Sequence, residues 1–168
     1  MPSERYTVRV TKDYLVFCCG HFITYDGSEC ERLHGHNYRA AVQIDGPLDE
    51  NHYVFDFIAL KNRTREIVDE LDHHMLVAMK NTKLPVTEDG ANVVVTFEGK
   101  RWSFPREDCV LLPIENTTTE LLAKWLAGRL LDVLHRQHNY RPAVLRVEVE
   151  ENVGQQAVYE WRAGEPGA

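Results

Sequence analysis

The residues His34-Gly35-His36, with Cys30 four positions before the first histidine, constrain this chain more than any other stretch. In an extended strand, side chains two positions apart project from the same face, so both histidines would offer a neutral imidazole to one cation. Gly35 lacks a side chain and suits close approach by a ligand or another strand. The motif predicts a strand that carries a metal-ligand pair, with the Cys30 thiol facing the same pocket.

A third imidazole is available at His21. It ends an apolar, alternating run that starts at Tyr14 and follows another such run at Tyr6–Val10. Antiparallel pairing of this strand with the one that carries His34 and His36 would bring the three rings together. Three protein ligands with one open position are typical of catalytic zinc. The alternative is that these histidines are ordinary polar residues near strand ends.

Length and composition predict one compact domain over residues 1–168. The chain has 168 residues, 43% of them hydrophobic, and a formal net charge of −7. The negative charge argues against nucleic acid as a partner. No apolar run approaches membrane-spanning length and the first residues lack a signal-peptide core, so we expect a cytoplasmic protein without a membrane partner. The four cysteines suggest no disulfide framework.

A helix is predicted over residues 58–71, where Leu60, Ile67, Val68 and Leu71 recur at helical spacing. Asp72-His73 follows it. An aspartate that accepts a hydrogen bond from one imidazole nitrogen fixes the tautomer and raises the basicity of the other nitrogen. Alternatively, a histidine here only interacts with the negative end of the helix dipole, which is the reading we prefer for His74.

The remaining pattern predicts an inserted β-hairpin within about residues 82–113, with a three-residue loop at Glu98-Gly99-Lys100, then a helix at 121–134 and a terminal hairpin. Thr117 and Glu120 have capping-box spacing at the start of the second helix. The order of elements predicts an α+β fold, with a four-stranded antiparallel sheet and two helices on one face.

The order of His21, Cys30-x-x-x-His34-Gly35-His36 and Asp72-His73 resembles the 6-pyruvoyltetrahydropterin synthase and 6-carboxytetrahydropterin synthase family. The three-residue gap between Cys30 and His34 is more similar to the bacterial carboxytetrahydropterin synthases. The resemblance covers nearly the whole chain, except for the longer segment around residues 82–113. It implies the family's tunnelling fold, Zn²⁺ on the three histidines, and a catalytic group of Cys30, Asp72 and His73. It also implies a homohexamer, a dimer of trimers, with active sites between subunits.

The resemblance further implies a pterin site. Thr118, Thr119 and Glu120 match a segment that helps hold the pterin ring, although the same stretch is also explained as a helix start. Counting back from Tyr159 places the pterin-anchoring glutamate at Glu151, with Glu150 as the one-residue alternative. A carboxylate can accept both adjacent N–H donors of a 2-amino-4-oxo pterin as a bidentate pair.

The implied substrate is a pterin triphosphate, 7,8-dihydroneopterin triphosphate. The implied product is 6-carboxy-5,6,7,8-tetrahydropterin, with release of acetaldehyde and triphosphate, a step that leads toward queuosine. A pyruvoyltetrahydropterin synthase is one alternative. Glu31, directly after Cys30, suggests another: aldolase-like formation of 6-hydroxymethyl-dihydropterin for folate, unless Glu31 is a solvated loop acid. A non-catalytic zinc or pterin-binding module is the reading from a different class.

Overall fold

The computed structural model describes residues 4–164 of the chain, which form a mixed α+β fold with two α-helices. The helices are α1 (Phe57–Asp69) and α2 (Thr119–His138). The strands are β1 (Tyr6–Val10), β2 (Val16–His21), β3 (Thr24–Tyr25), β4 (Glu29–Cys30), β5 (His34–Gly46), β6 (His74–Ala78), β7 (Val86–Asp89), β8 (Asn92–Phe97), β9 (Lys100–Pro105), β10 (Cys109–Leu112), β11 (Val144–Asn152) and β12 (Gln155–Arg162). Short 3₁₀ turns lie at Lys12–Tyr14 and Arg106–Asp108.

The main sheet has seven strands, so the expected four-stranded sheet is too small. Its order is β10-β6-β2-β5-β11-β12. β1 pairs with residues 42–46 of β5, on the same side of β5 as β2, which pairs with residues 34–39. The antiparallel part contains the strands that we predicted. β6 and β10 extend it as parallel strands beyond β2. All residues of Met75–Ala78 are buried, a continuous apolar run typical of parallel strands covered on both faces.

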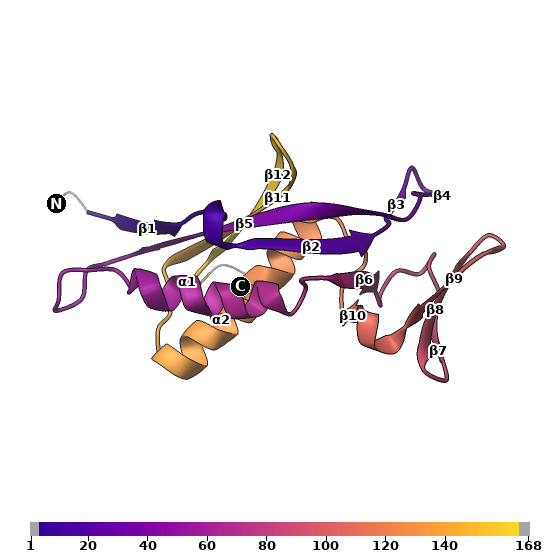
Figure 1. The fold of residues 1–168 in the computed structure, drawn as a ribbon. Coiled ribbons are helices and arrows are strands. Elements are labelled where there is room, and N and C mark those ends of the chain that lie inside the picture. Colours follow the sequence, from indigo (N-terminus) through magenta and orange to yellow (C-terminus); the bar gives the residue numbers. More distant parts are fainter. Residues whose placement is uncertain (1–3, 165–168) are drawn as a thin grey trace.

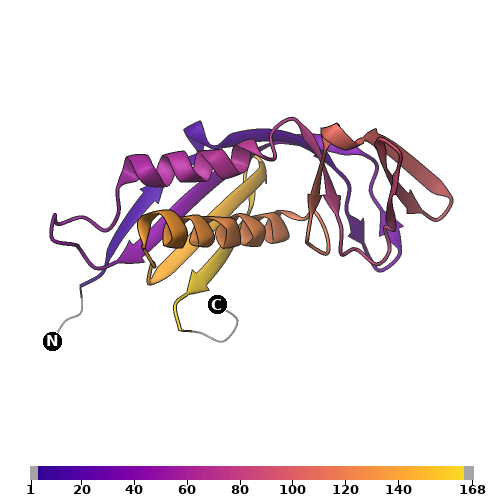
Figure 2. The same ribbon diagram turned by 90° about the horizontal axis from the view of Figure 1, so that it is seen from below.

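Both helices cover the same face of the sheet, as predicted (Figures 1 and 2). Asp56 caps α1 by accepting hydrogen bonds from the backbone N–H groups of Ile58 and Ala59. The predicted capping box at α2 is wrong. The N-cap is Thr118, which makes no side-chain capping bond, and the Thr117 hydroxyl instead donates to the carbonyl of Phe22 at 3.3 Å.

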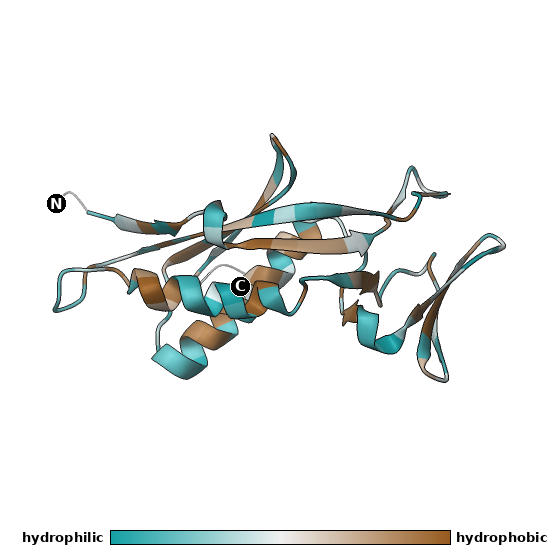
Figure 3. Ribbon diagram, viewed as in Figure 1, coloured by the Kyte–Doolittle hydropathy of each residue, from teal (hydrophilic) through white to brown (hydrophobic). Residues whose placement is uncertain are grey.

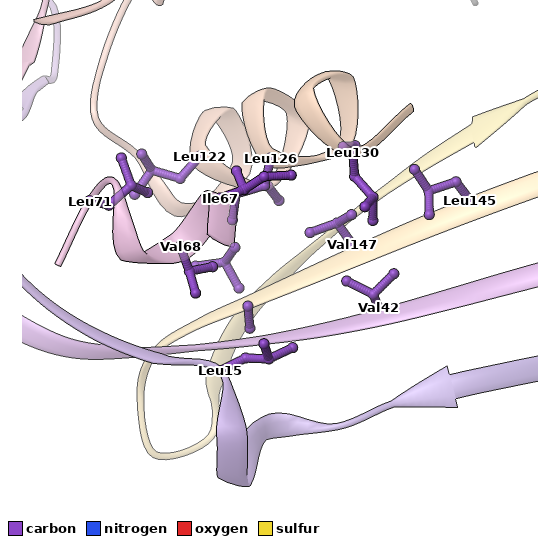
Figure 4. Close-up of a cluster of buried hydrophobic side chains, with 14 of the residues drawn as sticks. Leu15, Val42, Ile67, Val68, Leu71, Leu122, Leu126, Leu130, Leu145 and Val147 are labelled. Carbon is purple, nitrogen blue, oxygen red and sulfur yellow. The ribbon is translucent and has the colours of Figure 1, made fainter. Parts of the chain in front are cut away.

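The main core lies between the helices and the sheet. Leu122, Leu126 and Leu130 of α2 meet Ile67 and Val68 of α1 and the side chains of the strands below (Figure 4). Complete burial of a side chain of this size stabilises the fold by about 1.5–3 kcal/mol. The helices carry hydrophilic residues on their other faces (Figure 3), so amphipathic periodicity predicted them well.

The inserted segment forms a separate three-stranded antiparallel sheet of β7, β8 and β9 at one end of the molecule (Figures 1 and 2). The predicted hairpin is β8–β9, but its loop has two residues, because Phe97 pairs with Lys100. Glu98 and Gly99 both have positive φ, at 44° and 83°, as a tight hairpin turn requires. The additional strand, β7, was not predicted.

None of the helices in residues 4–164 is both long and apolar enough to cross a membrane.

Candidate metal and pterin site

The pairing of β2 with β5 brings the three predicted histidines together. His21 lies directly opposite His34, and Cys19 lies opposite His36. The ring centroids are 4.8 Å apart for His21 and His34, 5.3 Å for His21 and His36, and 4.8 Å for His34 and His36. The alternation of side chains along both strands is what places all three rings on one face.

Backbone carbonyls orient two of these rings. His21 Nδ1 lies 3.1 Å from the Thr117 carbonyl oxygen and His34 Nδ1 lies 2.8 Å from that of Arg32. A ring that donates from Nδ1 keeps a lone pair on Nε2, and metal-binding histidines are commonly held in this way. Burial lowers the pKa of His21, which is only 1% exposed, so its neutral form is favoured. We therefore assign Nε2 as its ligand atom.

The carboxylate of Glu151 completes the group. Its Oε1 lies 3.3 Å from His21 Nε2 and 3.2 Å from His36 Nε2. The donor atoms of His21, His34, His36 and Glu151 all lie within 4.8 Å of one another. A lone pair on a neutral imidazole and a carboxylate oxygen repel each other at this distance unless a cation or a proton lies between them. The group could therefore hold a metal ion.

The distances in this group suit a small tetrahedral cation. With Zn–N bonds of about 2.0–2.1 Å, the edge of a tetrahedron is about 3.3–3.4 Å. The two Glu151 separations of 3.2 and 3.3 Å are close to that edge. The donor set of imidazole and carboxylate is one that zinc accepts, so the residues fit the metal that the sequence predicts.

The sequence could not decide between Glu150 and Glu151, and the strand geometry separates them. The pairing of β11 with β12 shifts between Glu150 and Asn152, so a bulge lies at Glu151. The Glu151 side chain points to the histidines, whereas Glu150 Oε1 accepts a hydrogen bond from the N–H of Gly154 at 3.2 Å. Glu151 is therefore the acid beside the metal-capable group.

Sequence reasoning missed Tyr38. Its hydroxyl donates to Glu151 Oε1 at 3.2 Å and lies 3.1 Å from His21 Nε2. Burial, reinforced by the Glu151 carboxylate, raises the pKa of the Tyr38 phenol, which therefore stays protonated as a donor. Tyr38 is two positions after His36 on the same strand, so the alternation that paired His34 and His36 could have identified it.

The threonine segment before α2 takes part through one side chain. The Thr119 hydroxyl donates to Glu151 Oε2 at 3.3 Å. Thr118 is the N-cap of α2, and Glu120 is exposed in the first turn of that helix. Of the three predicted residues, Thr119 is the one with a hydrogen bond to this group.

Cys30 and Glu31 lie differently from what the sequence suggested. The Cys30 side chain is 8% exposed and belongs to an apolar cluster with Phe22, Met75 and residues of the inserted sheet. Burial raises the pKa of its thiol in this position. Glu31 Oε2, by contrast, lies 4.0 Å from His34 Nε2. Of these two neighbours, Glu31 is the one directed at the histidines.

Asp72 and His73 form the predicted pair, with His73 Nδ1 3.1 Å from Asp72 Oδ2. Asp72 Oδ1 accepts a hydrogen bond from the N–H of Cys18 at 2.7 Å, and the N–H of His73 donates to the Cys18 carbonyl at 2.6 Å. Burial opposes ionisation of Asp72, but the hydrogen bonds from Cys18 and His73 outweigh it and lower its pKa. His73 has a positive φ of 58°, and its side chain is 82% exposed. Within the described residues, Asp72 is the one polar partner of this ring.

A polar pocket of about 260 Å³ opens beside the metal-capable group. It is lined by residues 35–37 and Arg39 of β5 and by residues 150–153 at the end of β11. A small polar ligand in this pocket could therefore reach His36 and Glu151.

Comparison with known proteins agrees with this geometry. The sequence profile of the family described as 6-pyruvoyl tetrahydropterin synthase matches residues 9–162. A protein of Pyrococcus horikoshii, provisionally named a 6-carboxy-5,6,7,8-tetrahydropterin synthase, is 36% identical over 117 residues, which are 69% of each chain. The 6-carboxy-5,6,7,8-tetrahydropterin synthase of Aquifex aeolicus is 30% identical over 120 residues, which are 70% of this chain and 67% of that protein.

Among solved structures, the 6-pyruvoyltetrahydropterin synthase of Plasmodium vivax is similar over almost the whole chain. It has a TM-score of 0.88 and 30% identity, covering 95% of this chain and 99% of its own. A second structure of the P. vivax protein is described as a mutant in which a catalytic glutamate is replaced by alanine. The predicted family resemblance is thus confirmed, and it extends through the inserted segment.

Proposed function

Since this chain belongs to the 6-pyruvoyl tetrahydropterin synthase family, we propose that it is a zinc-dependent lyase acting on 7,8-dihydroneopterin triphosphate. The proposed product is 6-carboxy-5,6,7,8-tetrahydropterin, with release of acetaldehyde and triphosphate. The observation that carries this proposal is the convergence of His21, His34 and His36 with Glu151 within 4.8 Å. The names of the Pyrococcus and Aquifex relatives support the choice of reaction.

In the proposed site, the three imidazoles hold Zn²⁺, and the hydroxylated side chain of the pterin would take the fourth position, beside which Glu151 Oε1 lies in this structure. The bound metal would supply Lewis acidity toward the hydroxylated side chain of the pterin. Glu151 would accept the adjacent N–H groups along the pterin edge, since its carboxylate can form a bidentate pair. Tyr38 and Thr119 each donate to one oxygen of this carboxylate and would fix its plane before the pterin binds. Thr118 and Glu120 would border the ring.

Proton transfer needs a further acid or base. We assign this role to Asp72 and His73 together with Cys30 or Glu31, the two candidate residues that precede β5. The sequence argument placed Cys30 in this role. The Cys30 side chain is 8% exposed, and burial raises the pKa of its thiol, which disfavours the reactive thiolate in this position. Glu31 is already directed toward His34, with its Oε2 4.0 Å from His34 Nε2.

Asp72 and His73 would act across a subunit boundary. Their pair is anchored to the backbone of Cys18 while the His73 ring points to solvent. In the proposed homohexamer, a dimer of trimers, this exposed ring would enter the site of a neighbouring subunit. A size measurement in solution tests the assembly independently of the reaction.

A second reaction is favoured by the position of Glu31. An aldolase-like cleavage would break the C1′–C2′ bond of the side chain, leaving C1′ as the hydroxymethyl group of 6-hydroxymethyl-dihydropterin and releasing glycolaldehyde triphosphate, with a carboxylate moving the proton. The 4.0 Å separation of Glu31 Oε2 from His34 Nε2 supports this candidate, as does the catalytic glutamate of the P. vivax protein.

Product analysis separates the candidates. The zinc-loaded protein is incubated with 7,8-dihydroneopterin triphosphate, and the pterins and acetaldehyde are identified by chromatography and mass spectrometry. We expect 6-carboxytetrahydropterin and acetaldehyde, both lost in the His36→Ala control. Hydroxymethyl-dihydropterin alone would replace the first candidate with the second. Binding of metal and pterin without turnover would show a non-catalytic module.

A further inference from the structure

The thiol of Cys30 is held in place by a second apolar cluster that is separate from the main core. This cluster joins Phe22, Met75 and Val77 to buried residues of the inserted sheet, namely Val93, Val95 and Phe97. Cys30 is one of its members, and the two-stranded ladder of β3 and β4 pairs it with Thr24. The thiol is thus fixed both by its backbone pairing and by its apolar surroundings.

The inserted sheet closes this cluster with an aromatic contact. The ring of Trp102 on β9 stacks on Phe22 just after β2, with centroids 4.6 Å apart and an interplanar angle of 25°. Stacked aromatic pairs contribute about 0.5–1.5 kcal/mol beyond their buried area. The contact ties the insertion to the segment between β2 and β3.

The same segment positions Glu31. The N–H of Glu31 donates to the carbonyl of Ile23 at 3.0 Å, and Glu31 Oε2 accepts from the N–H of Ile23 at 3.4 Å. Neighbouring side chains of extended backbone point in opposite directions. With Cys30 directed into the apolar cluster, Glu31 is directed outward, 4.0 Å from His34.

We propose that the inserted β7–β9 sheet selects which of two adjacent residues serves the metal site: it holds Cys30 in the apolar cluster and thereby aims Glu31 at the histidines. Trp102 is then a positioning residue that acts through Phe22 and the backbone of Ile23. This inference rests on the proposed function only in taking the three histidines as the place of reaction. It adds that the insertion determines the proton-transfer group.

The rate at which iodoacetamide labels each cysteine tests this packing without an activity assay. Peptide mass spectrometry resolves the individual cysteines. Cys18 is exposed, and Cys19 is buried in the main core, so they are internal references for open and closed thiols. We expect Cys30 to react at least about tenfold more slowly than Cys18 in the parent protein. In Trp102→Ala, Cys30 should react several times faster while Cys19 remains protected.

Two matched variants control for the substitution. Trp102→Phe keeps an aromatic ring on Phe22 and should retain the parent rate. Arg101→Ala changes the exposed neighbour on β9, which faces Asp89, and should also leave the rate unchanged. If Trp102→Ala exposes Cys19 as well, the variant has lost its fold and Val95→Ala replaces it. Labelling of Cys30 as fast as Cys18 in the parent, or no change in either cluster variant, would overturn the proposal.

Turnover supplies the second test. Glu31→Gln should lower kcat by about 10²- to 10⁴-fold, the usual contribution of a general acid or base, with zinc content unchanged. Trp102→Ala should lower kcat in the parent but have no further effect in the Glu31→Gln background, because it acts through that carboxylate. Additive effects would refute the positioning role. Absence of turnover in the parent would refute the proposed function and leave the labelling result standing.

Discussion

Replacing Tyr38 with phenylalanine isolates one hydrogen bond of the pterin site. The ring of Tyr38 stacks on Phe17 with centroids 5.2 Å apart, and phenylalanine keeps that packing. The change deletes only the hydroxyl, which donates to Glu151 Oε1 and also lies 3.1 Å from His21 Nε2. Because burial keeps the phenol protonated, this donor is present throughout the working pH range of the protein.

The size of the effect follows from the surroundings of Glu151. A hydrogen bond to a charged group contributes about 1.5–3 kcal/mol. The Glu151 side chain is 27% exposed and keeps its bond from Thr119, so the lower end applies. A loss of about 1.4 kcal/mol corresponds to a tenfold change. We therefore expect Tyr38→Phe to weaken pterin binding about tenfold.

Pterin fluorescence measures this affinity directly on zinc-loaded protein, and the zinc content is determined in the same samples. Thr119→Val removes the donor on the other carboxylate oxygen and should have an effect of similar size. Unchanged pterin affinity in Tyr38→Phe, with zinc retained, would refute the claim that this hydroxyl orients Glu151. Loss of zinc from the variant would instead show that the Tyr38 hydroxyl supports metal binding.

Three further changes test the metal site and the sheet. Changing a residue that only hydrogen-bonds to a metal ligand weakens metal binding by roughly 10- to 100-fold, so His34→Ala, which removes a ligand, should weaken zinc binding by more than that. Competition with a chelator measures the affinity, and retained affinity would exclude His34 as a ligand. In Gly35→Ala the new Cβ would lie 3.0 Å from the Cys19 carbonyl oxygen, so we expect a loss of about 1–3 kcal/mol in the free energy of unfolding, and unchanged stability would show that the strands adjust. Burial opposes ionisation of Asp45, but hydrogen bonds led by that from Arg146 lower its pKa. The stabilisation from this lowered pKa is present above the unfolded pKa of about 4 and is lost as the pH falls through the folded value, so urea titrations should show Arg146→Met less stable by about 1–3 kcal/mol at neutral pH and converging with the parent in acid. A difference that does not depend on pH would contradict the linkage.

Local patterns were sufficient for the parts of the fold that obey a single periodicity. The helices and the long antiparallel strands have regular apolar spacing, and the spacing of His34 and His36 fixed their common face. Once β2 and β5 were taken as paired, His21 had to lie near them. The three histidines were therefore predictable from the sequence, whereas the position of Glu151 beside them and the role of Tyr38 were not.

The parts that failed depend on distant segments. β6 and β10 are short apolar runs without alternation, and only their neighbours in the sheet make them strands. The direction of Cys30 depends on the insertion, which begins more than 50 positions later in the sequence. The spacing of Thr117 and Glu120 fits a capping box, but the Thr117 hydroxyl donates to the Phe22 carbonyl instead. In each case a tertiary contact overrides the local preference.

The histidine group lies where β2 ends and β5 begins, outside the part of the sheet that the two helices cover. Zinc would cross-link these two strand ends and, through the Thr117 carbonyl on His21, the segment that leads into α2. Chelation would then leave the helix-covered amides slow to exchange with solvent deuterium. Faster exchange would be confined to β3, β4 and the first residues of β5, so the protein would lose its metal by local opening while the rest of the fold persists.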